Sequence, residues 1–95
     1  KVAAGEHERG IIICGTGIGI SISANKVKGV RAALCTCDYM AEMARKHNNA
    51  NILAFGGRTT TIDLAVRMIH IFLETKFEGG RHTVRVDKIN SLTGR

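Results

Sequence analysis

The stretch Gly10-Ile11-Ile12-Ile13-Cys14-Gly15-Thr16-Gly17-Ile18-Gly19-Ile20-Ser21 joins a short apolar run to a turn with alternating glycines. A continuous apolar run is typical of a parallel strand that is covered on both faces. Glycines at alternate positions let backbone N–H groups approach an anion closely, and a following helix points its N-terminus at the same place. The stretch therefore predicts a buried strand, an anion-binding turn and a short helix over about residues 18–26.

Two further apolar runs, residues 30–34 and 51–55, are also predicted to be buried strands. We expect helices over about residues 38–48, with Asp38 as the N-cap, over 61–76 and over 84–92. Alternating strands and helices predict an α/β fold: a Rossmann-like parallel sheet in three layers, with helices on both faces. The helix over 61–76 is apolar around most of its circumference, so we expect a second subunit beside it as well as the sheet.

The chain is expected to be one partial domain, residues 1–95, that lacks strands at its N-terminal side. It begins at Lys1 rather than Met, and Val2-Ala3-Ala4-Gly5 resembles the last turn of a helix. Three strands are also few for a sheet of this type.

Composition limits the partners of this chain. The formal net charge is +6, and only one Tyr and three Phe are present. Few aromatic rings make a base-stacking surface hard to build, so we expect a phosphorylated small molecule rather than nucleic acid. No apolar run reaches the roughly 20 residues of a membrane helix. Three cysteines form no disulfide framework, which indicates a reducing compartment and a cytoplasmic protein.

The glycine turn lacks a nucleotide signature, because Ile20 breaks the G-x-G-x-x-G spacing and no Gly-Lys-Ser/Thr follows. Cys14 stands directly before the turn. A thiol at a helix N-terminus ionises readily and can act as a base or nucleophile, although a buried structural cysteine is the alternative. The pair Cys35 and Cys37 has neither zinc nor redox spacing, so we expect core filling and no metal site.

Four blocks of the sequence together resemble the ribose-5-phosphate isomerase B family. They are the stretch quoted above, Ala24-Asn25-Lys26-Val27-Lys28-Gly29-Val30-Arg31-Ala32, the block from His47 to Gly56, and Phe77-Glu78-Gly79-Gly80-Arg81-His82 with Arg85-Val86. The resemblance implies reversible isomerisation of ribose 5-phosphate and ribulose 5-phosphate through a cis-enediolate, in the pentose phosphate pathway. It implies no organic cofactor and no metal.

The resemblance also assigns roles. Cys14 would take the proton from the carbon beside the carbonyl, Thr16 would assist at the hydroxyls, and His47 would help to open the furanose ring. The remaining substrate contacts would be the backbone of Gly15, Gly17, Ile18, Gly19 and Ser21, the amide of Asn48, and the guanidinium groups of Arg58, Arg81 and Arg85. Arginine suits phosphate because its planar fork binds two oxygens at once.

Family members are dimers or higher assemblies, so the resemblance implies a homodimer or homotetramer with a C-terminal helix that extends to the partner. It also implies composite sites, in which His47 and Arg58 serve the partner's pocket. The family's opening strand, with its Asp-His pair, has no counterpart here. Two alternatives stay open: the same chemistry on a six-carbon sugar phosphate, such as galactose 6-phosphate or allose 6-phosphate, and a phosphosugar-binding module without catalysis.

Overall fold

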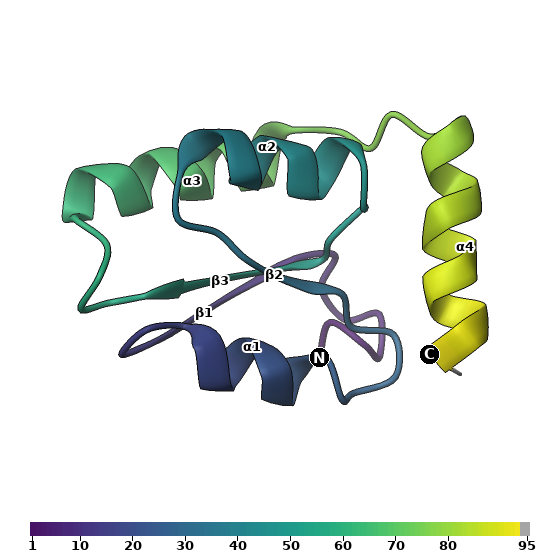
Figure 1. Cartoon of the computed structure of the whole chain (residues 1–95), viewed down its shortest axis with the longest axis horizontal. Helices are drawn as coiled ribbons and strands as arrows, with labels where there is room; N and C mark the ends of the chain where they lie inside the picture. The colour runs from purple at the N-terminus through teal and green to yellow at the C-terminus, as the bar shows by residue number, and fades with distance from the viewer. Residues whose placement is uncertain (94–95) are drawn as a thin grey trace.

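The computed structural model describes residues 1–93, and its centre is a parallel sheet with the strand order β1-β3-β2 (Figure 1). The elements in chain order are β1 (Gly10–Cys14), α1 (Ile18–Ala24), β2 (Ala32–Leu34), α2 (Asp38–Lys46), β3 (Ile52–Gly56), α3 (Ile62–Glu74) and α4 (Arg81–Thr93). Gly10 lies opposite Ile52 and Cys14 lies opposite Gly56, so β1 and β3 run in register over their full length. The predicted parallel α/β fold is confirmed.

Helices cover both faces of the sheet, which confirms the three layers. Helix α1 lies on one face, and α2 and α3 lie side by side on the other (Figure 1). Every residue of the central strand β3 is buried. The largest fully buried side chains include Leu53 of β3, Met68 and Phe72, which form the core between the sheet and α3. Helix α4 stands beside the layers, at the end of the sheet where the strands begin (Figure 1).

Two predicted boundaries were wrong for local reasons. Strand β2 begins at Ala32 rather than Val30, because the Val30 N–H donates to the Val27 carbonyl in a turn. Helix α4 begins at Arg81 rather than near residue 84, directly after Gly79 and Gly80, whose φ angles are +72° and +56°. That backbone region suits glycine, so the glycines mark the turn and the helix can start at once.

The prediction of Asp38 as a helix cap was also wrong. Asp38 is the first residue of α2, and Cys37 takes the cap position without a side-chain hydrogen bond. The Asp38 carboxylate instead accepts a hydrogen bond from Arg67 Nε of α3 at 3.1 Å. This ion pair links the two helices that share a face of the sheet.

Residues at the start of the chain form the helix-ending turn that their sequence predicted. The Glu6 N–H donates to the Lys1 carbonyl at 2.9 Å and the Gly5 N–H to the Val2 carbonyl at 3.1 Å. Gly5 is left-handed, with φ at +83°. These two bonds around a left-handed glycine are the Schellman motif.

The two neighbouring cysteines have different environments. Cys35 is buried in the core, as predicted, and burial raises its pKa to about 11, with a further contribution from Cys37. Cys37 is exposed at the start of α2, so core filling was wrong for this residue. Within residues 1–93, no helix combines the length and the apolar character that crossing a bilayer requires.

Candidate active site

Cys14 ends β1, and its sulfur lies over the turn that leads into α1. The Gly17 N–H donates a hydrogen bond to Cys14 Sγ at 3.2 Å. Gly17 is left-handed, with φ at +82°, and a Cβ there would lie 2.7 Å from a methyl group of Leu34. The sulfur therefore has a backbone donor of the turn as its hydrogen-bond partner, at the carboxyl edge of the sheet.

The first turn of α1 supplies amide donors next to that sulfur. N–H groups in the first turn of a helix have no carbonyl partner within the helix. The Ile18 N–H donates to Thr16 Oγ1 at 3.3 Å, which leaves the Thr16 hydroxyl hydrogen free to donate elsewhere. Ser21 differs from its neighbours: its N–H donates to the Gly17 carbonyl and its hydroxyl to the Ile18 carbonyl at 2.8 Å. In this structure both Ser21 groups are engaged within the helix.

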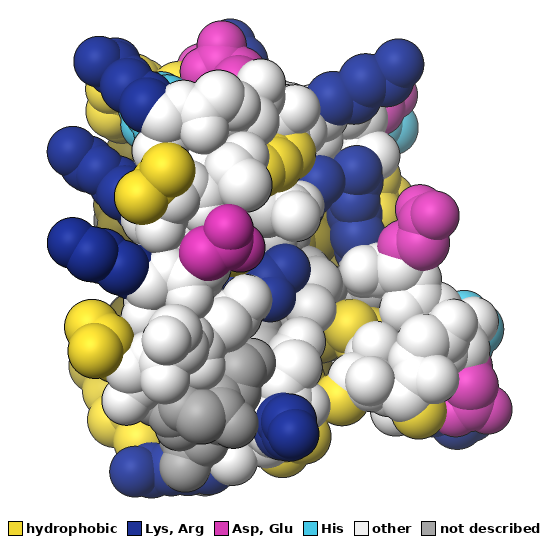
Figure 2. Space-filling view, turned by 90° about the vertical axis from the view of Figure 1, so that its right-hand side faces the viewer, with side chains coloured by type: hydrophobic (Ala, Val, Ile, Leu, Met, Phe, Trp, Pro, Cys, Tyr) yellow, Lys and Arg dark blue, Asp and Glu magenta, His cyan; other side chains and the backbone are white. Residues whose placement is uncertain are grey.

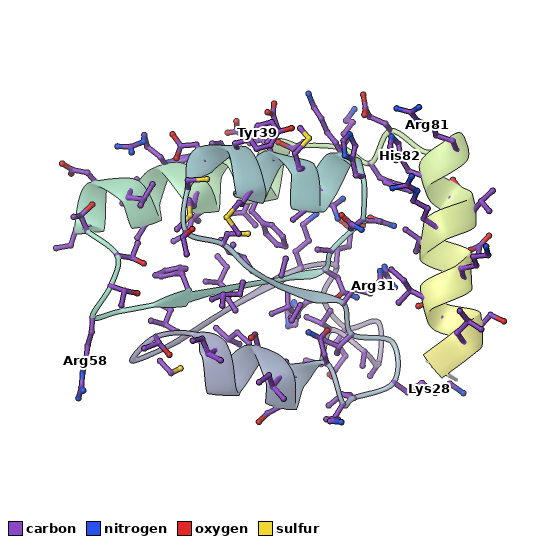
Figure 3. The ribbon with its side chains drawn as sticks, viewed as in Figure 1. Lys28, Arg31, Tyr39, Arg58, Arg81 and His82 are labelled. Carbon is purple, nitrogen blue, oxygen red and sulfur yellow. The ribbon has the colours of Figure 1, made fainter. Side chains whose placement is uncertain are left out.

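The loop after β3 crosses over the Cys14 turn and holds it. The Gly57 N–H donates to the Cys14 carbonyl at 2.6 Å, and the Arg58 N–H donates to the Gly15 carbonyl at 3.1 Å. At Gly56 a Cβ would lie 2.6 Å from the Gly15 carbonyl oxygen, so the crossing requires glycine. Arg58 is exposed at this end of the sheet, and its side chain points outward (Figure 3). Cys14 and Arg58 thus belong to one group.

The other predicted residues lie at the opposite end of the sheet from Cys14. His47 ends α2, Asn48 follows it, and Arg81 and Arg85 lie four residues apart on α4. Figure 3 shows Arg81 and Arg58 at opposite ends of the molecule. Lysine and arginine side chains are spread over the face that α4 occupies (Figure 2). The structure therefore divides the predicted site residues into a Cys14 group and a His47 group.

The division follows from the topology of the sheet. Helix α2 begins where β2 ends, at the same edge as Cys14, and runs back along the sheet. Its nine residues span roughly 13 Å at 1.5 Å per residue, so the residue that ends it lies near the other edge. Within one copy, His47 and Cys14 therefore lie at opposite edges of the sheet.

Two arginines that the sequence did not single out hold the backbone beside His47. The buried Arg45 donates to the Asn49 side chain at 2.8 Å, to the Ala50 carbonyl at 2.6 Å and to the Thr75 carbonyl at 3.1 Å. Arg31 donates to the Asn49 carbonyl through Nε and Nη2. Asn49 itself is left-handed, with φ at +48°. Charged hydrogen bonds therefore help to fix the turn after α2, in addition to the packing of Ala50 in the core.

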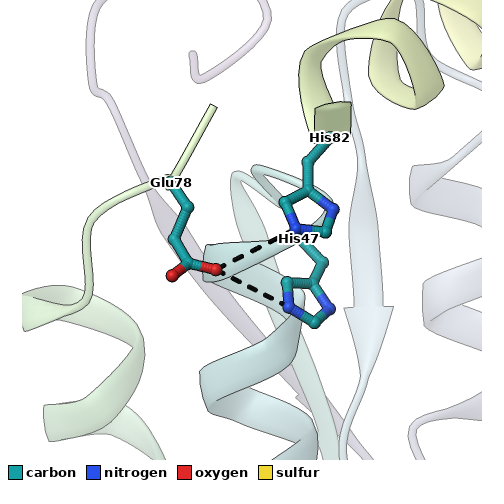
Figure 4. A group of neighbouring side chains, drawn as sticks. All are labelled: His47, Glu78 and His82. Atoms are coloured by element: carbon teal, nitrogen blue, oxygen red, sulfur yellow. Dashed lines mark ion pairs between the residues drawn. The ribbon is translucent and has the colours of Figure 1, made fainter. Parts of the chain in front are cut away.

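Glu78 and His82 were also missed as neighbours of His47. Glu78 Oε1 lies 3.7 Å from His47 Nε2 and 4.0 Å from His82 Nε2 (Figure 4). The spacing of four residues between Glu78 and His82, within a block already quoted, was the available signal. The approach of both to His47 depends on tertiary structure.

These three side chains are the group within residues 1–93 that brings three possible metal ligands together, with ligand atoms within 4.8 Å of one another. Imidazole lone pairs lie in the ring planes, and the rings of His47 and His82 are stacked within 14° of parallel. Their lone pairs therefore do not converge on one point. Arg81 and Arg85 also act electrostatically on His82, which disfavours a cation. The arrangement fits a carboxylate that faces two stacked imidazoles better than a metal site.

Comparisons with known proteins agree with this fold. A model of the ribose/galactose isomerase family matches residues 1–89. Ribose-5-phosphate isomerase B of Escherichia coli K12 is 48% identical over 94 residues, which are 99% of this chain and 63% of that protein. A galactose-6-phosphate isomerase subunit of Clostridium acetobutylicum is 49% identical over 88 residues, covering 93% of this chain and 51% of that protein.

Among solved structures, ribose-5-phosphate isomerase B of Clostridium thermocellum superposes with a TM-score of 0.95 at 56% identity. The match covers 98% of this chain and 63% of that one. The chain thus spans less than two thirds of the length of these relatives.

Proposed function

The chain belongs to the ribose/galactose isomerase family, and from this we propose that the protein interconverts ribose 5-phosphate and ribulose 5-phosphate. The observation that carries the proposal is the sulfur of Cys14, which accepts the Gly17 N–H at 3.2 Å beside the first turn of α1. Isomerisation of this kind needs a base next to preorganised donors, and this turn supplies both.

In the proposed reaction the Cys14 thiolate removes the proton from the carbon beside the carbonyl. The electron pair left behind forms the double bond of the cis-enediolate, and the negative charge moves to the carbonyl oxygen. Backbone N–H groups of the turn and the Thr16 hydroxyl then donate to that oxygen. The adjacent hydroxyl gives its proton to that oxygen, and Cys14 returns the first proton to the former carbonyl carbon, which completes the exchange of aldose and ketose. Preorganised donors of this kind are typically worth several kcal/mol of barrier lowering.

We further propose that each site is built from two copies of the chain. The Cys14 group of one copy, with Arg58, would face the His47 group of another. His47 would then assist ring opening, Asn48 would bind sugar hydroxyls, and Arg81 and Arg85 would bind the phosphate. The separation of the two groups at opposite ends of the sheet supports this arrangement, because each alone lacks part of the chemistry.

The surface near His47 also suits a partner. An open, mainly apolar hollow of about 500 Å³ lies along β2, with Asn48, Met40 and Ile89 among the residues that line it. On α4 the side chains of Val84, Ile89 and Leu92 are exposed although apolar. These features favour a homodimer or homotetramer in which α4 extends to the partner. The three free thiols favour a cytoplasmic protein.

A six-carbon substrate is the second candidate, and the similarity to a galactose-6-phosphate isomerase subunit supports it. A coupled assay of the complete protein with ribose 5-phosphate, galactose 6-phosphate and allose 6-phosphate separates the two. We expect turnover of the pentose phosphate to have the highest kcat/KM. Turnover of a hexose phosphate alone would overturn the preferred assignment.

Replacement of one thiol tests the mechanism. Cys14→Ala should lower kcat by about 100-fold or more while ligand binding is largely retained, because the base is lost and the donors remain. The matched control is Cys37→Ala, which removes an exposed thiol at the start of α2. Full activity of Cys14→Ala would contradict the proposal.

A further inference from the structure

His47 is enclosed by two side chains with no role assigned so far. The ring of His82, which is buried in the first turn of α4, stacks on the ring of His47 with centroids 4.1 Å apart. One oxygen of Glu78 faces the Nε2 atoms of both rings, at 3.7 and 4.0 Å (Figure 4). A single carboxylate is thus shared by two stacked imidazoles.

The backbone fixes this arrangement. The Glu78 N–H donates to the carbonyl of Lys46, the residue before His47, at 3.2 Å. The chain then turns through the left-handed Gly79 and Gly80, and the His82 N–H donates back to the Gly79 carbonyl at 3.1 Å. Glu78 and His82 are therefore held on either side of the end of α2 by bonds that do not involve their side chains.

Charge favours an unequal sharing of the carboxylate. Burial lowers the pKa of His82, and the neighbouring His47 and Arg81 lower it further, against the opposing effect of Glu78. His82 is therefore mostly neutral near pH 7. Because a neutral His82 attracts Glu78 only weakly, the carboxylate acts mainly on His47, whose side chain is the more exposed of the two.

We propose that Glu78 and His82 are positioning residues for His47: the carboxylate keeps a proton on Nε2, and the stacked ring fixes the plane of the imidazole. Nδ1, on the side of the ring away from Glu78, is then the nitrogen that gives and retakes a proton (Figure 4). This inference rests on the proposed ring-opening role of His47. At 3.7 Å the carboxylate acts on Nε2 through its charge, and a negative charge beside one imidazole nitrogen favours the proton on that nitrogen.

The chain offers a matched control. His70 and Glu74 on α3 form the same type of pair, with the same four-residue spacing found between Glu78 and His82, and lie 3.9 Å apart. Both side chains are largely exposed. An effect specific to the cluster should appear with Glu78→Gln and not with Glu74→Gln.

The experiment uses the complete protein and two independent measurements. Nitrogen-15 NMR of the histidine side chains at pH 7.5 reports which nitrogen of His47 carries the proton, and steady-state kinetics with ribose 5-phosphate give kcat and KM. For Glu78→Gln we expect a smaller share of His47 with Nε2 protonated, and kcat lowered about tenfold or more with KM changed less than about twofold. Glu78→Asp should restore part of both.

Two substitutions at His82 separate the stacking of its ring from the effects of its ring nitrogens. His82→Phe keeps a flat ring and should retain most of kcat, whereas His82→Ala removes the stack and should lower kcat with little change in KM. An unchanged proton distribution on His47 in Glu78→Gln, or an equal loss of kcat in Glu74→Gln, would overturn the inference. If the parent protein turns over no sugar phosphate, the proposed function fails, and the NMR measurement still decides the positioning role.

Discussion

The imidazole of His82 stacks on that of His47, with ring planes inclined by only 14°. Burial, His47 and Arg81 lower the pKa of His82, so the unfolded chain takes up a proton at this residue at a higher pH than the folded chain does. By linkage, its contribution to stability is constant above about pH 6.5 and is lost as the pH falls below that value towards the lowered pKa.

Thermal unfolding at pH 7.5 and pH 5.5 checks this pH dependence. The parent chain should lose more Tm between the two conditions than His82→Phe, which cannot take up the proton. Equal losses of Tm in the two proteins would show that the pKa of His82 is not lowered in the folded chain.

The three thiols should react in a defined order. Burial raises the pKa of Cys35 to about 11, so almost no thiolate forms there near neutral pH, whereas Cys14 is half-buried and Cys37 is exposed. Iodoacetamide at pH 7.5 should modify Cys14 and Cys37 and leave Cys35 intact until the protein is denatured. Peptide mass spectrometry gives the sites. Ribose 5-phosphate should protect Cys14 and leave Cys37 reactive; protection of neither would argue against a ligand beside Cys14.

Gly56→Ala should damage the Cys14 turn. The added Cβ would lie 2.6 Å from the Gly15 carbonyl oxygen and 2.6 Å from the Thr16 carbonyl carbon. Both are backbone atoms, which cannot shift without a cost in free energy. We expect a loss of about 1–3 kcal/mol in the free energy of unfolding, together with lower kcat. The control is Gly19→Ala, where a Cβ meets nothing within 4 Å and the helix should gain about 0.5–1 kcal/mol. Denaturant unfolding that ranks the two variants the other way would contradict the close crossing.

Arg45→Met should destabilise the fold and disturb His47. Methionine fills similar space, but the carbonyls of Ala50 and Thr75 and the Asn49 side chain lose a charged donor. Hydrogen bonds from a charged group are worth about 1.5–3 kcal/mol each and are not additive, so we expect a total loss of about 2–4 kcal/mol. Denaturant unfolding measures it. A loss as small as that of a substitution at the exposed Arg58 would mean that these bonds contribute little.

Mixing two inactive variants tests the composite site. Cys14→Ala and His47→Gln should each have low activity, because each damages a different group. After unfolding and refolding together as dimers, half of the molecules carry one of each chain, and one of their two sites has both groups intact. Activity should therefore recover to about a quarter of the parent value. No recovery, with both chains present in the same assembly by mass spectrometry, would place both residues in a site of one chain.

Much of the fold could be predicted from the sequence, because the strands are continuous apolar runs and glycines mark the turns. Strand β3 and helix α3 were displaced from their predicted bounds by one or two residues. Other predictions were wrong because a competing hydrogen bond formed. The Arg31 N–H donates to the Asn51 side chain instead of extending β2, and Asp38 pairs with Arg67 instead of capping α2.

The site residues were predicted one by one, and Arg58 was grouped with His47 as a residue that serves a partner's pocket. That grouping was wrong, because the Arg58 N–H donates to the Gly15 carbonyl beside Cys14. The position of His47 far from Cys14 follows from the direction in which α2 runs. The cluster of Glu78 and His82 around His47 depends on where α4 packs, and no local pattern encodes that contact. The roles of Arg31 and Arg45 also depend on tertiary structure, because they are set by the backbone carbonyls that accept their hydrogen bonds.

The Cys14 group and the His47 group lie at opposite ends of the sheet, so substitutions can alter them separately. If each site takes one group from each of two copies, as proposed, one duplicated gene could lose the thiol group and the other the histidine group, and a pair of the two chains would still hold one working site. Each gene would then depend on its sister. A fold arranged in this way is predisposed to give rise to enzymes made of two unlike chains.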